Sequence, residues 1–367
     1  MRSKSKIVIG LLIAMFFSGE YLFTRQPERT SLAVGQVFRN QPLQPAFASE
    51  QWPREGPGPV LDLTSMIEHA DLIVVGQVVS VRDNGRKVVP DKERGYEGQQ
   101  MTAALNVTRT LKGPEKIGPL EFEIFAPAFG SGYAVVSPKQ FGMFFLKTEK
   151  GKYAVLDPYY PFVIAPRQHH ALVGADTDRV VGEIVYILAD RTSSEEDRRK
   201  AVYVLDGAHV ASATEALRLA THDADTVVRL QALAALLKRN DISQLNIAED
   251  ILLRQPPNIE QYLKSNLAAA LGGIKDSRAI PVLTHLLAAS EVRVRRRAAA
   301  ALRQMGGTDS IPALVIALND SDAGVRYEGV VGLAEITSQY EWAPSVEVFQ
   351  KDEQRYLTHW REWARTR

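Results

Sequence analysis

Two successive stretches decide the fold: residues 276–305 read DSRAIPVLTHLLAASEVRVRRRAAAALRQM, and residues 307–336 read GTDSIPALVIALNDSDAGVRYEGVVGLAEI. Each contains an Ile-Pro pair that is followed 14 residues later by an arginine. These arginines belong to a register of regularly spaced cations that extends toward the N-terminus. Its five members are Arg198, Arg229, Lys264, Arg295 and Arg326, separated by 31, 35, 31 and 31 residues. Repetition at a period of about 20 to 50 residues is the sequence signature of a solenoid.

Apolar residues flank these cations at fixed distances. Seven residues after each cation stands a leucine, namely Leu205, Leu236, Leu271, Leu302 and Leu333. Twelve residues before each stands a large apolar side chain, namely Tyr186, Leu217, Leu252, Leu283 and Leu314. Apolar and small residues recur in steps of three and four after each cation, which predicts an amphipathic helix that a neighbouring helix can approach closely. Pro281 and Pro312 fit the first turn of another helix that precedes it. Because one helix pair cannot bury its own apolar stripe, we expect about five antiparallel pairs to stack into an α-solenoid over residues 177–340.

An acidic residue stands four positions before most of the cations. These residues are Asp225, Glu260, Glu291 and Asp322. They open the predicted second helix of each unit, where a carboxylate accepts hydrogen bonds from free backbone N–H groups and opposes the helix dipole. Each also lies one turn from its own cation or beside that of the next unit. We therefore interpret acids and cations together as a structural ladder of charges along the stacking axis.

The repeat resembles that of the HEAT-repeat family, in the short-unit form named for phycobilisome lyases. The matching residues are Asp276 to Leu283, Val294-Arg295 with Ala298 to Leu302, and, one unit later, Ile311 to Leu314 and Val325-Arg326 with Gly332-Leu333. The resemblance implies that the second helices form a concave docking surface. It also implies an alternative function, that of a lyase-type enzyme or an enzyme accessory. HEAT-repeat hydroxylases have His-Glu pairs that bind iron, and this sequence contains no His-Glu dipeptide.

Residues 61–165 are predicted to form a small OB-like antiparallel β-barrel after a short helix within residues 61–70. Runs of β-branched and aromatic residues predict five strands, within residues 72–81, 101–111, 120–125, 142–147 and 153–156. The polar stretch 82–100 is predicted to be a surface loop. The domain is loosely similar to the barrel of the netrin and tissue-inhibitor type, but the cysteines of that family are absent, so its protease-inhibiting function does not carry over. The predicted fold class is therefore α+β and multidomain, with a barrel followed by a solenoid.

The N-terminal stretch has the pattern of an export signal. Cations up to Lys6 precede an apolar run from Ile7 to Phe17, which is shorter than the roughly 20 residues of a membrane span. We expect residues 1–23 to be a signal peptide or signal anchor, and residues 24–60 to be a proline-rich linker. The protein is therefore predicted to be exported and to be periplasmic, extracellular or anchored to the membrane by its N-terminus. An intracellular repeat protein whose N-terminus is merely apolar is the alternative.

The last stretch, residues 341–367, departs from the repeat. Tyr356, Trp360 and Trp363 are spaced by four and three residues, so they share one face of a predicted helix. Because a solenoid needs its last apolar face covered, we interpret this stretch as a C-terminal capping helix. The alternative is an exposed aromatic stripe that binds a partner.

Composition and motifs exclude several classes of function. With 44 basic and 43 acidic residues the net charge is +1, so no global field points to nucleic acid. The absence of cysteine excludes disulfides, thiolate metal sites and a cysteine nucleophile. The seven histidines form no HExxH motif, and no G-x-S-x-G motif is present. We therefore predict no catalytic residue, no metal site and no cofactor.

One local excess of positive charge surrounds the ladder arginine Arg295. It consists of Arg293, Arg296, Arg297 and Arg303. We expect a basic surface for an acidic partner or for lipid head groups, with a solvated face as the alternative. The predicted function is that of a non-enzymatic scaffold of the bacterial envelope, which docks a protein partner of unknown identity on the concave face of the solenoid.

Overall fold

The computed structural model describes residues 61–89, 97–127, 135–168, 173–190, 192–254, 256–257 and 259–367, which all belong to one compact unit, Ala46–Arg367. A short helix, α1 (Leu63–His69), comes first. Its N-cap Asp62 accepts a hydrogen bond from the N–H of Ser65 at 2.9 Å, which satisfies a donor that the first turn leaves free. The predicted short helix within residues 61–70 is therefore present.

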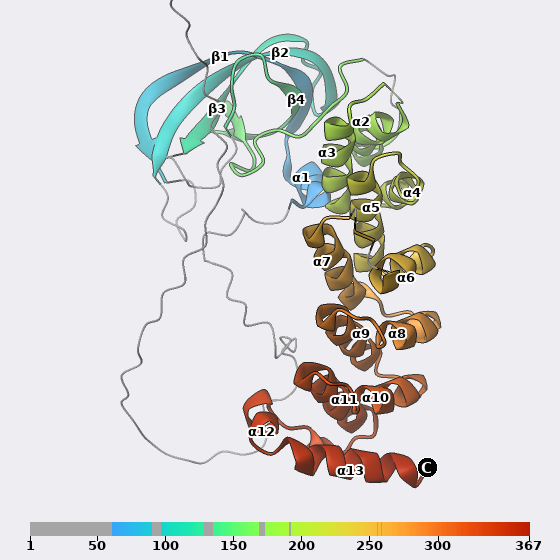
Figure 1. The fold of residues 1–367 in the computed structure, drawn as a ribbon. Coiled ribbons are helices and arrows are strands. Elements are labelled where there is room, and N and C mark those ends of the chain that lie inside the picture. The colour runs from blue at the N-terminus through green and yellow to red at the C-terminus, as the bar shows by residue number, and fades with distance from the viewer. Residues whose placement is uncertain are drawn as a thin grey trace, which may run out of the picture. The chain divides into compact units, whose positions relative to one another are not determined.

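Five strands form one sheet in the order β1, β2, β3, β5, β4 (Figure 1). They are β1 (Leu72–Val88), β2 (Gly98–Lys112), β3 (Gly118–Pro127), β4 (Phe141–Glu149) and β5 (Lys152–Val155). The sheet closes on itself because β1 pairs with both β2 and β4. The prediction of an all-antiparallel sheet is wrong for one pair, since β3 and β5 run parallel. In a closed sheet whose neighbouring strands all run in opposite directions, the number of strands must be even. A closed sheet of five strands must therefore contain at least one parallel pair.

All five predicted strands are present, but one prediction about a loop is wrong. β1 continues to Val88 and pairs there with Gly98 of β2, so much of the polar stretch 82–100 is strand. The residues from Arg82 to Lys87 are all exposed, so polarity was no obstacle to pairing there. Between β4 and β5, Lys150 and Gly151 have φ angles of 51° and 78°. Two successive residues with positive φ are what a tight two-residue hairpin requires.

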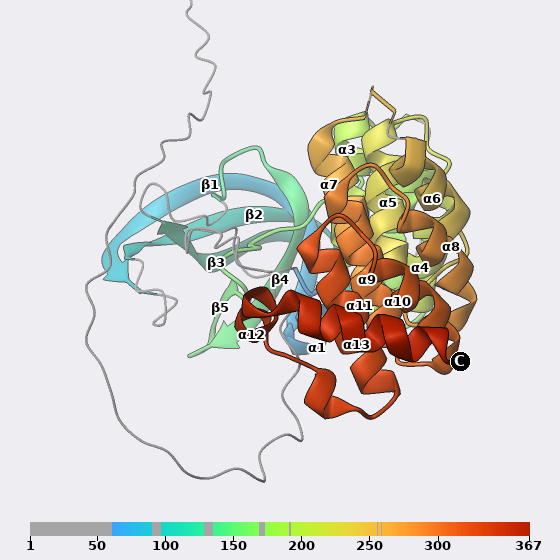
Figure 2. The same cartoon turned by 60° about the horizontal axis from the view of Figure 1, so that its bottom comes forward.

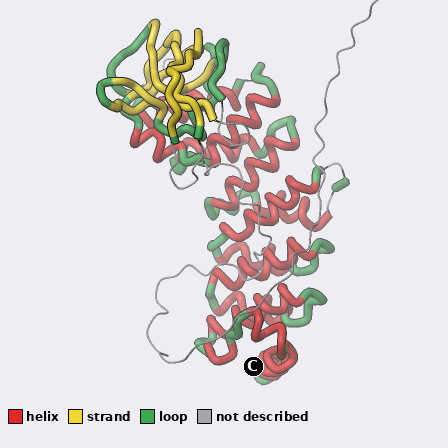
Figure 3. The backbone as a smooth tube through the Cα atoms, turned by 90° about the vertical axis from the view of Figure 1, so that its left-hand side faces the viewer, coloured by secondary structure: helices red, strands yellow, loops and turns green. Residues whose placement is uncertain are grey.

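The rest of the chain consists of stacked helix pairs. The first helices of five pairs are α2 (Asp176–Ala189), α4 (Ala211–Ala220), α6 (Leu245–Arg254), α8 (Ile280–Leu286) and α10 (Ile311–Ala317). The second helices are α3 (Glu195–Asp206), α5 (Thr226–Lys238), α7 (Gln261–Ala270), α9 (Val292–Met305) and α11 (Ala323–Ile336). From α6 onward the first helices lie in one row and the second helices in another (Figure 1), and successive pairs stack on one another (Figure 3). The predicted helical solenoid is confirmed.

The repeated leucines make up the core of this stack. Each of the five that follow the cations is 0% exposed, and they are Leu205, Leu236, Leu271, Leu302 and Leu333. Gly329 and Gly332 let α11 approach α10 closely, because a Cβ atom at either position would lie 2.9 Å from an atom of Leu314. The expectation that small residues permit close helix packing is therefore confirmed for this pair.

The core of the sheet continues into the core of the first helices. One cluster of buried side chains contains Phe145 of β4, Ile184 of α2 and Leu205 of α3. The N–H of Leu63 in α1 donates to the carbonyl oxygen of Gly207, after α3, at 2.8 Å. One face of the sheet and the first helix pairs are therefore packed around shared side chains, whereas the other face, with Leu72, Phe122 and Phe144, has a buried cluster of its own.

The C-terminal stretch covers the end of the stack. It forms α12 (Val346–Lys351) and α13 (Glu353–Arg365), and α13 lies across the end of α10 and α11 (Figure 2). Tyr356 and Trp360 are buried, and Trp363 packs against the same core. These are the aromatic residues that the sequence placed on one helix face.

The predicted signal segment, residues 1–23, and the predicted linker, residues 24–60, lie outside the described residues. The described residues include no helix with the length and apolar character needed to cross a membrane.

Candidate functional site

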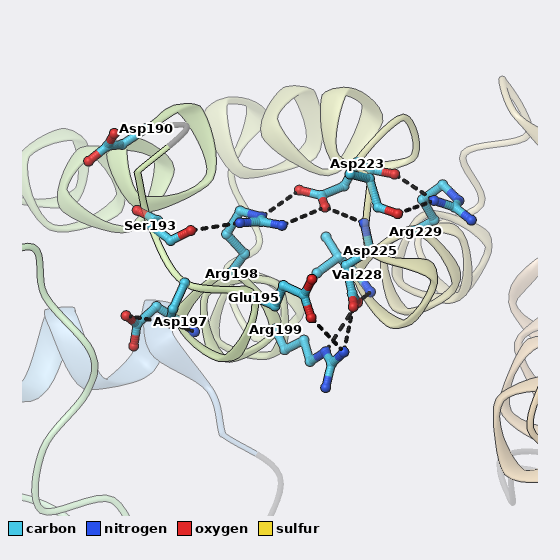
Figure 4. Close-up of polar contacts among 12 residues, drawn as sticks. Asp190, Ser193, Glu195, Asp197, Arg198, Arg199, Asp223, Asp225, Val228 and Arg229 are labelled. Atoms are coloured by element: carbon cyan, nitrogen blue, oxygen red, sulfur yellow. Dashed lines mark hydrogen bonds and ion pairs between the residues drawn. The ribbon is translucent and has the colours of Figure 1, made fainter.

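Arginines on the second helix of one pair bind carboxylates that precede the second helix of the next pair (Figure 4). In the first pair, Arg198 donates from Nε to Oδ2 of Asp223 at 2.8 Å and from Nη2 to Oδ1 at 3.1 Å. The next residue, Arg199, donates from Nε to Oδ1 of Asp225 at 3.1 Å. The same Asp225 oxygen accepts from the N–H of Val228 at 2.9 Å, so this aspartate caps α5 as predicted.

The arrangement returns at the fourth pair. Arg295 donates from Nε to Oδ2 of Asp320 at 2.8 Å, and Arg296 donates from Nε to Oδ1 of Asp322 at 2.7 Å. Asp322 also accepts from the N–H of Val325 at 3.0 Å and caps α11. The N-cap aspartates Asp225 and Asp322 bind Arg199 and Arg296, each of which directly follows a cation of the register. The cations themselves, Arg198 and Arg295, bind Asp223 and Asp320, which stand two positions before the N-caps. The acids were predicted to lie beside their own cation or that of the next unit. The two N-cap aspartates instead bind the second helix of the preceding unit, one residue after its cation, and each of these two steps has a second carboxylate.

The ladder is interrupted in the middle of the solenoid. Arg229 donates to the main-chain oxygens of Asp223 and Ala224, at 2.7 and 2.9 Å, at the start of its own second helix. Lys264 is 7% exposed. Within the described part of the chain, neither of these two cations forms an ion pair with a carboxylate. The two regular sections of the ladder are therefore separated by α5 and α7.

Two of the four predicted N-cap acids do not cap by their side chains. Glu260 and Glu291 precede α7 and α9 without a side-chain hydrogen bond to the first turn. Glutamate is one methylene longer than the aspartates that do cap, which fits the general preference for short side chains at this position. At the end of the ladder, Arg326 binds Glu353 at the start of α13, so the cap replaces the missing sixth pair.

Two arginines of the run on α9, Arg296 and Arg303, bind carboxylates of the chain itself. Arg303 donates from Nε to Glu335 at 2.8 Å and from Nη1 to Glu328 at 3.1 Å, and 13% of its side chain is exposed. Arg296 is engaged by its N-cap aspartate, as described above. Arg293 donates from Nη1 to Oγ of Ser265 on α7 at 3.0 Å and is exposed. Arg296 and Arg303 thus serve contacts within the chain, and the binding role predicted for the run, including Arg297, stays a prediction.

The second helices α7 and α9 share an accessible surface, which we call the open face. It comprises three positions on each helix: two residues before, one residue after and five residues after the cation, which is Lys264 on α7 and Arg295 on α9. Steps of three and four residues place these positions on one helix face. These residues are Tyr262, Ser265 and Ala269 on α7 and Arg293, Arg296 and Ala300 on α9. All six are exposed or half-buried, and Tyr262 is 49% exposed. The hydrogen bond from Arg293 to Ser265 joins the two helices along this face.

Other segments of the chain contact the equivalent positions on the outer helices. On α3, the hydroxyl of Tyr203 lies 3.0 Å from that of Tyr160, in the segment after the sheet. On α11, Tyr327 is 5% exposed, donates to the carbonyl oxygen of Pro344 at 3.1 Å and packs edge-on against Phe349 at 5.3 Å. Tyr203 is nevertheless 51% exposed, so the structure covers the equivalent position only on the α11 side of the open face.

Several carboxyl groups along the second helices have shifted pKa values, among them Asp225 and Glu328. The hydrogen bond from Arg199 lowers the pKa of Asp225 to about 2. Burial raises the pKa of Glu328, although the guanidinium of Arg303 opposes this. The ladder aspartate is thus held ionised, whereas the carboxyl between α9 and α11 is stabilised in its neutral form by burial.

No metal-binding group of three or more histidine, aspartate or glutamate side chains occurs within the residues that the structure describes. His169 and His170 lie outside those residues.

The comparisons with known proteins agree with the helical repeat. A family model of HEAT repeats matches residues 258–334, which include α7, α9 and the open face. No curated protein sequence matches the chain.

Several solved structures are similar to parts of the chain. One is the YibA protein of Escherichia coli, at 21% identity and a TM-score of 0.30, over 43% of this chain and 62% of that one. An engineered protein is 21% identical with a TM-score of 0.33, over 50% of this chain and 95% of its own. Human deoxyhypusine hydroxylase in complex with glycerol is 17% identical with a TM-score of 0.24, over 51% of this chain and 72% of its own. At these scores the likeness supports no conclusion about function.

Sequence reasoning missed the pairing of the residues that follow the register, although Arg296 itself was predicted as part of a basic binding surface. Arg199 and Arg296 each stand directly after a cation, and Asp223 and Asp320 each stand two residues before a predicted N-cap. Both pairs recur at the same offset from the register, so the repeat itself contained the signal. Tyr262 was also missed, because its exposure depends on which segments cover the neighbouring helices.

Proposed function

We propose that this chain, which contains HEAT repeats at residues 258–334, is a non-enzymatic scaffold of the bacterial envelope that docks a protein partner on its second helices. The observation that supports docking most directly is the open face of α7 and α9. It presents Tyr262 and Arg293, and tyrosine and arginine are the residue types that contribute most to protein interfaces. Small residues two turns further along the same helices, Ala269 and Ala300, leave room for a partner's main chain.

The location in the envelope rests on the N-terminal sequence. The cations before Ile7 and the apolar run up to Phe17 have the pattern of an export signal. We propose further that the repeats are of the phycobilisome-lyase type and that the closed five-stranded sheet is an OB-like barrel similar to the netrin and tissue-inhibitor type. The alternative of a lyase-type enzyme or enzyme accessory stays a prediction, and none of the contacts described above favours it.

Site-specific photo-crosslinking in cells tests the docking surface in the full chain. A photoreactive residue at Tyr262 or Arg293 is expected to give a discrete crosslinked protein in the envelope fraction. The matched control is Leu253 on the first helix α6, which is 36% exposed and belongs to the other row of helices. Equal crosslinking from all three positions, or none from the two on the open face, would remove the proposed surface.

Fractionation of the same cells tests location separately. Recovery of the chain and its crosslinked product in the periplasm or membrane supports export. Recovery in the cytoplasm with crosslinking intact would refute the location and leave the docking surface standing.

A further inference from the structure

A second candidate site lies where the sheet meets the first helix of the solenoid. A cavity of about 340 Å³ is lined by the end of β2, by the segment that follows it and by the first turn of α2. Three cations, Arg109, Lys112 and Arg179, line it together with one acid, Glu115. The cavity falls within the size range of small-molecule sites, which occur preferentially at domain interfaces.

Arg109 is a buried cation with an unused donor beside this cavity. It is 5% exposed, and its Nε and Nη2 donate to Glu183 of α2 and to the carbonyl oxygen of Pro166. Its Nη1 is buried and has no hydrogen-bond partner among the described residues. Buried polar groups are nearly always paired, so a guanidinium nitrogen in this state needs an explanation.

The other two cations also have donor capacity to spare. Arg179 binds Asp176 through Nη2, while its Nε is buried and unpaired within the described part of the chain. Lys112 donates from Nζ to the carbonyl oxygens of Ile67 and Glu68 at 2.7 and 3.0 Å, which uses two of its three N–H groups on uncharged acceptors. Arginine and lysine side chains cannot accept hydrogen bonds, so a ligand that fits among them must supply acceptors and negative charge.

The geometry points to a binding site for a small anion with a phosphate or carboxylate group, held between Arg109, Lys112 and Arg179. Guanidinium groups match both anions because their N–H groups pair with two oxygens at once. The site does not depend on the open face, since β2, the segment after it and α2 line it and no residue of α7 or α9 does. Occupation would join the sheet to the solenoid through the anion as well as through the shared core.

Titration calorimetry on the full chain tests the proposal, with inorganic phosphate in one arm and succinate in the other. We expect saturable binding of at least one anion with a Kd at or below about 1 mM. Arg179→Gln and Lys112→Gln should each weaken it by at least about tenfold, because each removes a charged donor. The control is Arg254→Gln, an exposed arginine in an ion pair with Asp250 on α6, and its affinity should equal that of the parent.

The two arms identify the ligand class, since tighter binding of phosphate or of succinate assigns the anion. Added neutral salt should weaken binding in either arm, because the attraction is electrostatic. No saturable binding of either anion would overturn the proposal, and so would equal affinity in the parent and in Arg179→Gln. Circular dichroism of the variants confirms that each is folded. Arg109 is not substituted, because its loss would leave the buried carboxylate of Glu183 without its ion-pair partner.

Discussion

Arg109 of β2 and Glu183 of α2 form an ion pair with only 5% and 1% of their side chains exposed, and Nε lies 2.6 Å from Oε1. The pair joins a strand to a helix 74 residues further along the chain. Two charges withdrawn from water in this way are stable only while both are present. The contact therefore makes the position of the first helix pair dependent on the sheet.

Arg109→Met should destabilise the protein by about 3 to 5 kcal/mol, because it leaves Glu183 charged and buried without a partner. The double variant Arg109→Met/Glu183→Leu should recover much of the loss. Urea unfolding measures both. The control is Arg82→Met in the exposed pair with Glu121, both 62% exposed, which should change stability by less than about 1 kcal/mol. A double variant no more stable than the single one would contradict this account.

The two regular sections of the ladder should respond alike to loss of an aspartate. Asp223→Ala and Asp320→Ala each remove a bidentate acceptor from an arginine that is 13% or 11% exposed, so each should cost about 2 to 3 kcal/mol. Glu196→Ala, in an exposed pair with Lys200, should cost less than about 1 kcal/mol. The measurement is the midpoint of urea unfolding. A clear difference between the two aspartates would show that the sections are not equivalent.

The contribution of Asp225 to stability should depend on pH. Its pKa is lowered to about 2 in the folded protein by Arg199, against about 3.9 when unfolded. A lowered folded-state pKa stabilises the protein above the unfolded value, and this contribution is lost as the pH falls from about 4 to about 2. Carboxyl titration by NMR should therefore give a midpoint near 2, and Arg199→Gln should raise it. A midpoint near 3.9 in the parent would contradict the ion pair.

The glycines of α11 should not tolerate a methyl group. In Gly329→Ala the new Cβ would lie 2.9 Å from the main-chain oxygen of Leu314, which cannot move aside as a side chain can. Overpacking should outweigh the better helix propensity of alanine and leave a net loss of about 1 kcal/mol. Gly307→Ala is the control, since nothing lies within 4 Å of its Cβ position and its φ is −89°. A shift in melting temperature for the first variant alone is expected.

Because the sheet and the first helix pairs share a core, they should open together. Phe145→Ala in β4 should lower hydrogen-exchange protection in α2 and α3 as well as in the sheet, at a cost of about 3 to 5 kcal/mol. Leu302→Ala, in the core cluster of the later pairs, should leave protection of the sheet unchanged. Loss of protection confined to the sheet in Phe145→Ala would show that the two parts fold independently.

Much of the solenoid could be predicted because its determinants are local and repeat. Leu205 and Leu333 are both 0% exposed although 128 residues separate them, since each occupies the same place in its unit. Strand positions were also predictable from their apolar and aromatic residues. The five-membered ring of strands forces a parallel pair, but no single strand in the sequence reveals how many will close the ring.

The contacts that could not be predicted join residues in different contexts. Nothing near Arg109 or Glu183 in the sequence marks them as partners, because the pair arises from the docking of a strand on a helix. The open face was equally hidden, since whether a position on a second helix is accessible depends on other segments, as the covering of Tyr327 by Pro344 and Phe349 shows. The segment around Pro344 and Phe349 belongs to the cap and follows no repeat.

The break in the ladder at Arg229 and Lys264 has a mechanical consequence. Paired arginine–aspartate contacts brace α3 against the start of α5 and α9 against the start of α11, whereas α7 is joined to α9 by apolar packing and by weaker polar contacts such as the hydrogen bond from Arg293 to Ser265. Bending of the solenoid should therefore concentrate around α7, where the open face begins. The curvature of the solenoid could then adjust at that place to the shape of a bound protein.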